Sequence, residues 1–352
     1  MGSCAHPAVA LAAALAFAAV PARAGEQWSM ATSWGGGPLL EQAAKPVAAL
    51  IEELTRGEVM VQVHAGGGLG GALKVTETVR TAVAEAGHSW DGYDWTVDKA
   101  SMLFGGYAGG MNAEQTLHWL YQGGGRQLYR EYRLQRFGVE TLPCGALPAE
   151  MGMHSRKRVQ SLADMQGLKL RTAGVWAEIA PGLGISTVPL PGVELQQALE
   201  RGVIDAFEWA QLSLNRSIGF HRIAKFLIMP GIHQPSTVQA CSFNKERWAL
   251  LAEANRRAIE IAAEAVTFDL YLSVGHADLE AYRFFLNAGN EIVVLDRDAV
   301  DKARELAFAW ADRIAAEAGS GSWFARVLEH QRAYQRAWAG SRKWRVSAVD
   351  PE

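Results

Sequence analysis

The sequence predicts an α/β protein with two lobes. Two observations indicate this fold class: segments with strand-like and helix-like patterns alternate along the chain, and about 328 of its 352 residues remain after a predicted signal peptide. Such alternation is typical of helices layered against sheets. A chain of this length exceeds one comfortable hydrophobic core, so it is expected to divide into two lobes.

Residues 1–24 have the pattern of a secretory signal peptide. An apolar stretch is followed by Pro21 and by the small-residue pattern ARA at 22–24, after which cleavage is expected. The stretch is too short to span a bilayer, and no later segment has about 20 uninterrupted apolar residues. The mature protein is therefore expected to be exported and soluble.

The elements are predicted from two patterns. Short, mainly apolar runs predict strands, and apolar residues that recur every three to four positions predict helices. In the first half of the mature chain the expected order is a strand at 28–34, a helix at 38–57 with a break near Pro46, a strand at 58–65, a helix at 72–85, a loop rich in Gly and Trp, helices at 114–121 and 127–137, and a strand at 139–145.

The middle of the chain contains two strands that end on charged residues. A helix-start signature at 161–164 precedes the strand LKLR, which ends on Arg171. A helix at 191–200 leads through a Gly stop into the short apolar run that ends on Glu208, followed by Trp209. A carboxylate at the end of a buried strand requires a partner, which indicates a ligand or a cation nearby.

Beyond Asn244 the pattern becomes mainly helical. A long helix is expected over 245–286, a strand over 291–295, and two further helices over 298–318 and 323–338. The last two helices are separated by GSGS, which predicts that the final helix is a separable arm.

Charge and cysteine content narrow the partners. The chain has 34 Lys and Arg against 37 Asp and Glu and no basic block, which makes nucleic acid and anionic membranes poor partners. Only Cys144 and Cys241 remain after cleavage. They could pair in an oxidising compartment, and two separate buried thiols are an equal alternative.

Two catalytic signatures are incomplete. The run HAGGGLGG contains the spacing of a dinucleotide fingerprint, but it follows the second strand, and no acidic residue ends a clear strand about 20 positions later. A tight turn that needs glycine backbone freedom is the favoured interpretation. GHSWDG has Asp91 where a nucleophile elbow requires Gly. The nine His are scattered without HExxH spacing, so no metalloenzyme motif is present.

Four polar residues lie at the ends of predicted elements: Glu150, Arg171, Glu208 and Gln234. Taken alone, each of these residues is equally consistent with an exposed residue of a loop. Together they favour a binding site, because ligands of α/β sheets bind at the carboxyl ends of strands. Arg is suited to a carboxylate ligand, and two carboxylates with an amide oxygen suit a hard cation. Aromatic residues in loops or at strand ends are candidate site walls: Trp34, Trp90, Trp95 and Trp209.

Three segments carry a family resemblance: LADMQGLKLRTAG, ALERGVIDAFEW and GFHRIAKFLIMPGIHQPS. They resemble the substrate-binding subunits of TRAP (tripartite ATP-independent periplasmic) transporters, and most closely the branch that binds 2-oxo and 2-hydroxy monocarboxylates. The resemblance covers nearly the whole mature chain. It implies a periplasmic-binding-protein (flytrap) fold with mixed sheets flanked by helices, one long helix that spans both lobes, and extra C-terminal helices.

The resemblance also implies how the chain is divided. Lobe I would comprise 25–147 and about 237–276, and lobe II would comprise 148–236 and about 277–305. The C-terminal helices would occupy 306–352 and carry a homodimer contact. The expected location is the periplasm, and the expected partners are a small organic acid and the membrane subunits of the transporter.

By resemblance, Arg171 holds the ligand carboxylate, and Glu208 with the backbone carbonyl of Trp209 binds a cation, Na⁺ or Ca²⁺. Glu150 stands where this branch has Gln, and Gln234 stands where it has Glu. The expected cation ligands are therefore Glu208, Trp209, Glu150 and Gln234. Alternatively, Glu150 accepts hydrogen bonds from the hydroxyls of a polyhydroxy acid. Tyr93 and Trp34 are further expected ligand contacts.

The sequence therefore predicts a periplasmic solute-binding protein for a 2-oxo or hydroxy carboxylate, with no nucleotide. An exported metal- or nucleotide-dependent enzyme acting on a small organic acid is the alternative from another class. A binding protein that serves a sensor domain is a third.

Overall fold

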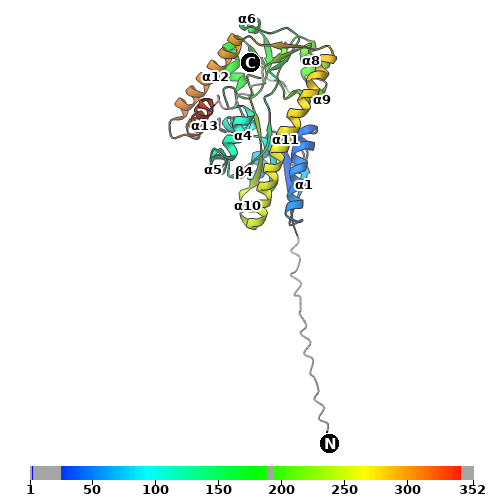
Figure 1. Cartoon of the computed structure of the whole chain (residues 1–352), viewed down its shortest axis with the longest axis vertical. Helices are drawn as coiled ribbons and strands as arrows, with labels where there is room; N and C mark the ends of the chain where they lie inside the picture. Colours follow the sequence, from blue (N-terminus) through cyan, green and yellow to red (C-terminus); the bar gives the residue numbers. More distant parts are fainter. Residues whose placement is uncertain (1, 3–24, 189, 191–193, 342–352) are drawn as a thin grey trace.

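The computed structural model describes residues 2, 25–188, 190 and 194–341. The predicted signal peptide and the last eleven residues lie outside the described part, so the signal peptide stays a prediction. The described chain forms two mixed sheets flanked by helices, with one long helix running beside both (Figure 1). The α/β fold with two layered bodies expected from the sequence is thus confirmed.

The first sheet has the strand order β2-β1-β3-β10-β4. Strands β2, β1 and β3 are parallel, and β10 runs antiparallel between β3 and β4. Its strands are β1 (Glu26–Thr32), β2 (Val59–His64), β3 (Ala86–Trp90), β4 (Val139–Leu147) and β10 (Thr237–Asn244).

The second sheet has the order β11-β9-β5-β8-β6-β7. Its strands are β5 (Met153–Ser155), β6 (Lys169–Arg171), β7 (Ser186–Val188), β8 (Ala206–Phe207), β9 (Phe226–Met229) and β11 (Glu291–Val294). Strands β6 and β8 are parallel, with Arg171 opposite Phe207. The strands of each sheet fall within the ranges expected for one lobe; the lobe boundaries themselves stay a prediction.

The helices cover the sheets and connect the strands. The long helix α11 (Glu253–Asn287) packs against β4 and also against α9, so it joins elements of both parts. The other α-helices are α1 (Lys45–Leu54), α2 (Val75–Arg80), α3 (Ser101–Gly105), α4 (Ala113–Tyr121), α5 (Gly125–Phe137), α6 (Leu162–Met165), α7 (Trp176–Ile179), α8 (Leu195–Glu200), α9 (Leu212–Ile218), α10 (Lys245–Leu250), α12 (Arg297–Ala318) and α13 (Trp323–Gly340). A π-helical turn (Leu40–Ala44) precedes α1, and short 3-10 turns occupy Asp91–Asp94, Ala180–Leu183 and Phe220–Arg222.

Several local predictions are confirmed. The helix break near Pro46 is the change from the π-helical turn to α1. Ser161 Oγ accepts a hydrogen bond from the amide of Asp164, and the Asp164 carboxylate accepts one from the amide of Ser161, which is a capping box.

The single helix expected over 245–286 is in fact two, because the backbone leaves the helical region at Leu251 and Ala252.

Strand β3 is the main element that the sequence pattern did not predict. Its residues AGHSW contain a Gly and two polar residues, which lowers strand propensity. The Gly is required by packing: a Cβ at Gly87 would lie 2.5 Å from Val75 and 2.8 Å from Val79 of α2. The helix expected over 72–85 is accordingly shorter, because the chain must turn after Arg80 to enter this strand.

The two cysteines form a disulfide between adjacent strands. Cys144 of β4 and Cys241 of β10 are bonded, with their Cα atoms 5.2 Å apart. Their positions are 97 residues apart, so the pairing depends on β10 entering the sheet beside β4. The sequence had left paired and separate thiols as alternatives, and the structure has the pair.

Helix α13 is not a separable arm. Phe324, Val327 and Leu328 are buried against the rest of the chain, and Phe324 packs edge-on against Trp310 of α12. The Gln331 side chain donates a hydrogen bond to the carbonyl of Leu103. The expectation drawn from the GSGS linker was wrong, because the apolar face of this helix belongs to the core of its own chain.

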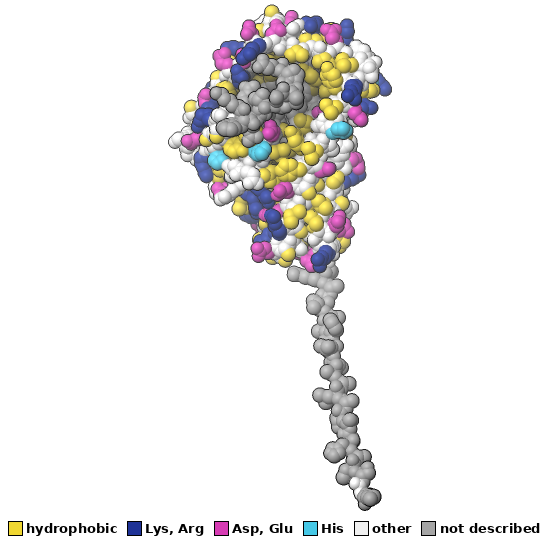
Figure 2. Space-filling model, in the orientation of Figure 1, with side chains coloured by type: hydrophobic (Ala, Val, Ile, Leu, Met, Phe, Trp, Pro, Cys, Tyr) yellow, Lys and Arg dark blue, Asp and Glu magenta, His cyan; other side chains and the backbone are white. Residues whose placement is uncertain are grey.

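Charged side chains are spread over the surface. Figure 2 shows Lys and Arg intermixed with Asp and Glu on the face that it draws, in line with the balanced counts. Among the described residues, none of the helices has the length and apolar content needed to cross a membrane.

His154 is a buried histidine, and neither ring nitrogen has a hydrogen-bond partner within the described part of the chain. It stacks on Phe207, and burial lowers its pKa to about 3. A depressed histidine pKa stabilises the fold above the unfolded pKa near 6.5. This stabilisation is lost as the pH falls toward the folded pKa, and the loss reaches about 2 kcal/mol at pH 5.

We therefore expect His154→Phe to flatten the acid side of the stability curve. Wild type should lose about 2 kcal/mol more than the variant between pH 7.5 and pH 5, since only the wild type must keep a neutral imidazole. Urea unfolding at the two pH values measures the difference. Equal losses in both proteins would contradict the buried neutral state.

Candidate functional site

A cavity of about 700 Å³ lies between the two sheets. The first sheet contributes residues that follow or end its strands, such as Trp34 and Trp90, and the second contributes Arg171 and Glu208. The other lining residues used below are Tyr93, Met102, Glu150, Val175, Trp176, Trp209, Gln211, Leu214, Ile218, His233, Gln234, Thr237 and Gln239. All seven residues that the sequence nominated for the ligand line this one cavity.

Arg171 is fixed at the carboxyl end of β6. Its Nε donates to the carbonyl of Leu190 at 3.0 Å, and its Nη1 donates to the backbone carbonyl and to Oε1 of Glu208, both at 3.3 Å. The guanidinium lies 5.2 Å from the ring centroid of Trp209. Only 13% of the Arg171 side chain is exposed, so its charge is held in a place where water screens it weakly.

Glu208 comes directly after β8, the strand next to β6. Because the two strands are parallel, Arg171 and Glu208 reach the same edge of the sheet. Glu208 Oε1 also accepts a hydrogen bond from the backbone amide of Ala173 at 3.0 Å. Burial raises the pKa of Glu208 and Glu150 raises it further, while His233 and Arg171 lower it; the net direction is upward.

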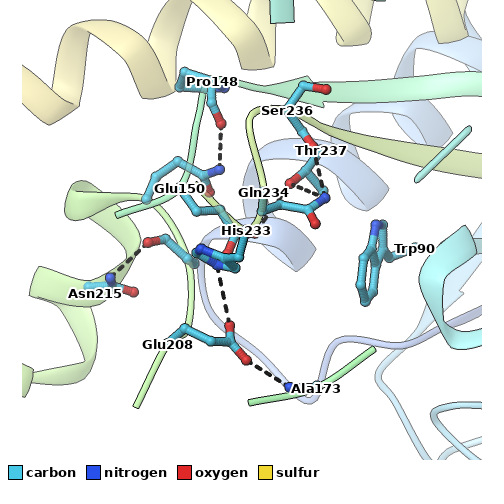
Figure 3. A network of polar contacts seen from close by, with 12 residues as sticks. Trp90, Pro148, Glu150, Ala173, Glu208, Asn215, His233, Gln234, Ser236 and Thr237 are labelled. Carbon is cyan, nitrogen blue, oxygen red and sulfur yellow. Dashed lines mark hydrogen bonds and ion pairs between the residues drawn. The ribbon is translucent and has the colours of Figure 1, made fainter. Parts of the chain in front are cut away.

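Glu150 and His233 complete a cluster with Glu208 (Figure 3). His233 Nε2 lies 3.2 Å from Glu150 Oε2 and 3.8 Å from Glu208 Oε2. Burial lowers the pKa of His233, but the hydrogen bond that its ring donates to Glu150 and the charges of both carboxylates raise it more, so the net direction is upward. One ligand atom from each of the three side chains lies within 4.8 Å of the others, which is suitable spacing for a bound cation.

Gln234 turns its amide nitrogen away from this cluster. The Nε2 atom donates to the carbonyl of Gly105 at 3.0 Å. It also lies 2.8 Å from the carbonyl of Ser236 and 3.4 Å from Oγ1 of Thr237 (Figure 3). Gln234 is 6% exposed, and a Cβ at Gly106 would lie 2.6 Å from the same nitrogen. Thr237 Oγ1 donates to Glu150 at 3.2 Å and so links this wall to the carboxylates.

Aromatic side chains form much of the remaining wall. Burial raises the pKa of Tyr93 to about 12, with Glu150 adding to the shift, so the hydroxyl stays protonated. The Trp34 indole donates to Nδ1 of His88 at 2.8 Å, which orients its ring at the cavity. Trp90 packs edge-on against Tyr93, with ring centroids 5.2 Å apart. Trp95, also expected at the site, is not among the lining residues.

Two amide oxygens in the cavity wall have no hydrogen-bond partner among the residues that the structure describes: Gln211 Oε1 and Gln239 Oε1. Both side chains are almost fully buried. Buried acceptors are normally satisfied, so these two atoms indicate that a donor or a cation enters the cavity.

His233 is the site residue that sequence reasoning missed. It precedes Gln234 in the run PGIHQPS, and the nine scattered His gave no metal spacing. The one sequence feature that pointed to His233 is its position next to Gln234, which was already a candidate site residue. The structure shows that His233, not Gln234, presents its side chain to both carboxylates.

Comparison with known proteins places the chain in a family. The family model for bacterial extracellular solute-binding protein, family 7, matches residues 30–317. A curated relative, the monocarboxylate 2-oxoacid-binding periplasmic protein of Nostoc sp., is 28% identical over 315 residues, which covers 89% of this chain and 85% of the relative.

Two solved structures of TRAP periplasmic solute-binding proteins are similar to this chain. The protein from Pseudoalteromonas atlantica, with bound sodium and pyruvate, is 26% identical with a TM-score of 0.83, over 91% of this chain and 97% of that one. The protein from Colwellia psychrerythraea, with bound calcium and pyruvate, is 26% identical with a TM-score of 0.81, over 90% and 96%.

The match spans both sheets and the long helix, and the fold agrees with that of the solved relatives. The predicted alternative of an exported enzyme is therefore wrong. The chain belongs to the bacterial extracellular solute-binding proteins of family 7, and it is a substrate-binding protein of the TRAP type rather than an enzyme.

Proposed function

We propose that this periplasmic protein captures a small 2-oxo or 2-hydroxy carboxylate between its two sheets and delivers it to the membrane subunits of a TRAP transporter. One observation carries the proposal: the buried guanidinium of Arg171 shares a cavity with the cluster of Glu150, Glu208 and His233. The relatives that bind 2-oxo acids or pyruvate support it.

Each residue has a distinct role in this proposal. Arg171 holds the ligand carboxylate, for which a guanidinium offers paired donors. Glu150 and Glu208 hold a cation, with the backbone carbonyl of Trp209 as a further ligand. The cation supplies positive charge that the carboxylate and 2-oxygen of the ligand can contact. The oxygen donors fit the sodium or calcium of the solved relatives, and His233 adds a nitrogen donor.

Gln234 is assigned to the cavity wall rather than to the cation. Its amide nitrogen is used by two backbone carbonyls, which holds the segment before β10 in place. Closure of the two parts around the ligand would exclude water and strengthen the contact with Arg171, as in other hinge-closing proteins.

The cavity has room for more than a three-carbon acid. Its volume is about 700 Å³, and the wall beyond the charged cluster is mainly apolar. Side chains of that wall include Trp34, Trp90, Met102, Val175, Trp176, Leu214 and Ile218. A ligand that carries an apolar substituent on its 2-oxo acid group would bury that substituent here.

Thermal unfolding in the presence of candidate acids tests the proposal. A ligand at 100 times its dissociation constant adds about 2.7 kcal/mol to stability, so even modest binders raise the Tm. We expect 2-oxo acids with apolar substituents to raise the Tm most, and EDTA or exchange of Na⁺ for K⁺ to reduce the effect. If no 2-oxo or 2-hydroxy acid raised the Tm, the proposed function would be contradicted. If the Tm shifts were the same with and without the cation, only the proposed role of the cation would be contradicted.

We also propose a homodimer through the C-terminal helix α13, with a contact limited to the outer face of that helix. Since α13 buries Phe324, Val327 and Leu328 in its own chain, only its outer face is available to a partner. Removing residues from Trp323 onward would uncover the core, so light scattering of the intact mature protein is the suitable measurement.

A further inference from the structure

Tyr93 faces the charged end of the ligand cavity from a short turn. It lies in the 3-10 turn Asp91–Asp94, directly after β3, and it lines the cavity. Burial is the main cause that raises the pKa of its hydroxyl, the charges of Glu150 and Glu208 raise it further, and the charge of Arg171 lowers it. The hydroxyl therefore lies near all three charged groups, and at neutral pH it is a donor that can meet the carboxylate or the 2-oxygen of a ligand.

The conformation of this turn depends on contacts with other elements. The turn has only four residues, and its N-cap residue Trp90 supplies no side-chain hydrogen bond to it. Hydrogen bonds of 3-10 turns have poorer geometry than those of α-helices. Gly92 packs closely on Trp90, because a Cβ at Gly92 would lie 2.3 Å from atoms of the indole ring. The position of the hydroxyl on this turn is therefore set by whatever holds the turn from outside.

A buried polar cluster holds both ends of the turn. Arg133 Nη1 lies 2.7 Å from Asp94 Oδ2 and 3.4 Å from Asp91 Oδ1. The hydroxyl of Tyr129 donates a hydrogen bond to Oδ2 of Asp91. Thr76 of α2 accepts from Arg133 Nη2 at 2.8 Å and donates to Asp94 Oδ2 at 2.7 Å. Since Tyr129 and Arg133 both belong to α5, this pair of side chains is named here the α5 anchor.

The charges of this cluster are strongly held because water has little access to them. The Arg133 side chain is 0% exposed and that of Asp91 is 2% exposed, so screening is weak. Burial raises the pKa of Asp91 to about 6 although Arg133 lowers it, so the carboxylate is mainly ionised at pH 7.5. Asp91 is also the residue that breaks the nucleophile-elbow pattern in GHSWDG. Its role in the structure is to tie the turn to α5.

We propose that Tyr129 and Arg133 are positioning residues for ligand binding, because they hold the turn at the place where the Tyr93 hydroxyl meets the ligand. The identity of the ligand as a 2-oxo acid rests on the proposed function, whereas the anchor itself does not. Neither residue of the α5 anchor is among the described residues that line the cavity. A turn that lost its anchor would have to be ordered again when the ligand binds, and this cost weakens binding.

Two tyrosines of the same helix provide a matched pair of variants. Tyr129→Phe removes one hydroxyl of the α5 anchor and leaves both ionised partners in place. Tyr132→Phe is the control: both tyrosines are fully buried and both rings pack on Phe104, but the Tyr132 hydroxyl has no hydrogen-bond partner within the part of the chain that the structure describes.

Titration calorimetry with pyruvate as the probe measures the effect on affinity. Tyr129→Phe is expected to weaken binding by about three- to tenfold, the factor for ordering a side chain on binding. Tyr132→Phe is expected to stay within about twofold of wild type. Equal affinities in the two variants would overturn the proposal.

A double-mutant cycle tests whether the anchor acts through Tyr93. Tyr93→Phe removes the hydroxyl that the anchor is proposed to position. In that background Tyr129→Phe should cause no further loss of affinity for pyruvate, although it should still lower the stability of the fold, since its hydrogen bond to Asp91 is lost in both backgrounds. Additive losses of affinity would overturn the assignment, because they would show that Tyr129 acts on the site by another route.

Hydrogen exchange in the ligand-free protein tests the anchor without any ligand. Backbone amides of residues 91–94 should exchange faster in Tyr129→Phe and in Arg133→Lys than in wild type, since a lysine keeps the charge but lacks the forked donors of arginine. Tyr132→Phe should exchange at the wild-type rate. Unchanged exchange in Tyr129→Phe and Arg133→Lys would overturn the anchor. Failure of wild type to bind pyruvate or any other 2-oxo acid would instead contradict the proposed function, and the exchange rates would still decide whether α5 holds the turn.

Discussion

Replacing Arg171 with Ala is expected to weaken ligand binding by on the order of 2–5 kcal/mol, the range for losing one partner of a buried, hydrogen-bonded charge pair. The guanidinium is held at the cavity by Leu190, Glu208 and the ring of Trp209. Without it, the ligand carboxylate would enter a cavity that contains Glu150 and Glu208 and no arginine among its described lining residues. Titration calorimetry measures the loss.

Two variants separate the role of Arg171 from a general effect of charge. Arg171→Lys keeps the charge but cannot offer paired planar donors, so an intermediate affinity is expected. Arg158→Ala removes a surface charge in the loop after β5 that pairs with Glu291 and does not line the cavity, so affinity should stay unchanged. Wild-type affinity in Arg171→Ala, with intact circular dichroism, would exclude a contact between Arg171 and the ligand carboxylate.

Replacing Gln234 with Glu is expected to destabilise the fold by about 3–5 kcal/mol at neutral pH, the cost of an uncompensated buried charge. The Gln234 amide donates to the carbonyls of Gly105 and Ser236, and a carboxylate there would face two acceptors instead. Its pKa would rise, so the penalty is present above that raised pKa and fades as the pH falls toward 4. Urea unfolding at pH 7.5 measures the loss of stability, and urea unfolding at pH 4 measures how far that loss decreases in acid.

A neutral variant provides the control for this effect. Gln234→Met loses the hydrogen bonds of the amide without adding a charge, so a smaller loss of stability that does not vary with pH is expected. A Gln234→Glu protein with wild-type stability at pH 7.5 would show that the wall can accept a carboxylate.

The structure also changes what is expected of the charge exchange between Glu150 and Gln234. From the sequence, Glu150→Gln combined with Gln234→Glu keeps two carboxylates and should restore much of the binding. In the structure both side chains contact the hydroxyl of Thr237. Their other partners differ, because Glu150 contacts His233 whereas the Gln234 amide donates to two backbone carbonyls. The combined variant is therefore expected to keep the stability loss of Gln234→Glu and to recover little binding.

The fold could be predicted where local patterns agreed with the tertiary structure. Strands β1, β2 and β4 and helices α4 and α5 lie where the local sequence pattern predicts them. Strand β3 was missed because its glycine is explained only by contact with α2. The disulfide could not be assigned because its strands are neighbours only after β10 has crossed back into the first sheet.

The sequence by itself determined the two-lobe α/β class, the resemblance to the family and the strand-end positions of Arg171 and Glu208. These depend on periodicity and on short contiguous segments. Only the tertiary structure decided that His233 joins Glu150 and Glu208 and that Gln234 turns to backbone carbonyls. The physical reason is that such contacts join residues many positions apart, and the direction of each side chain follows from sheet register and packing rather than from its neighbours in the chain.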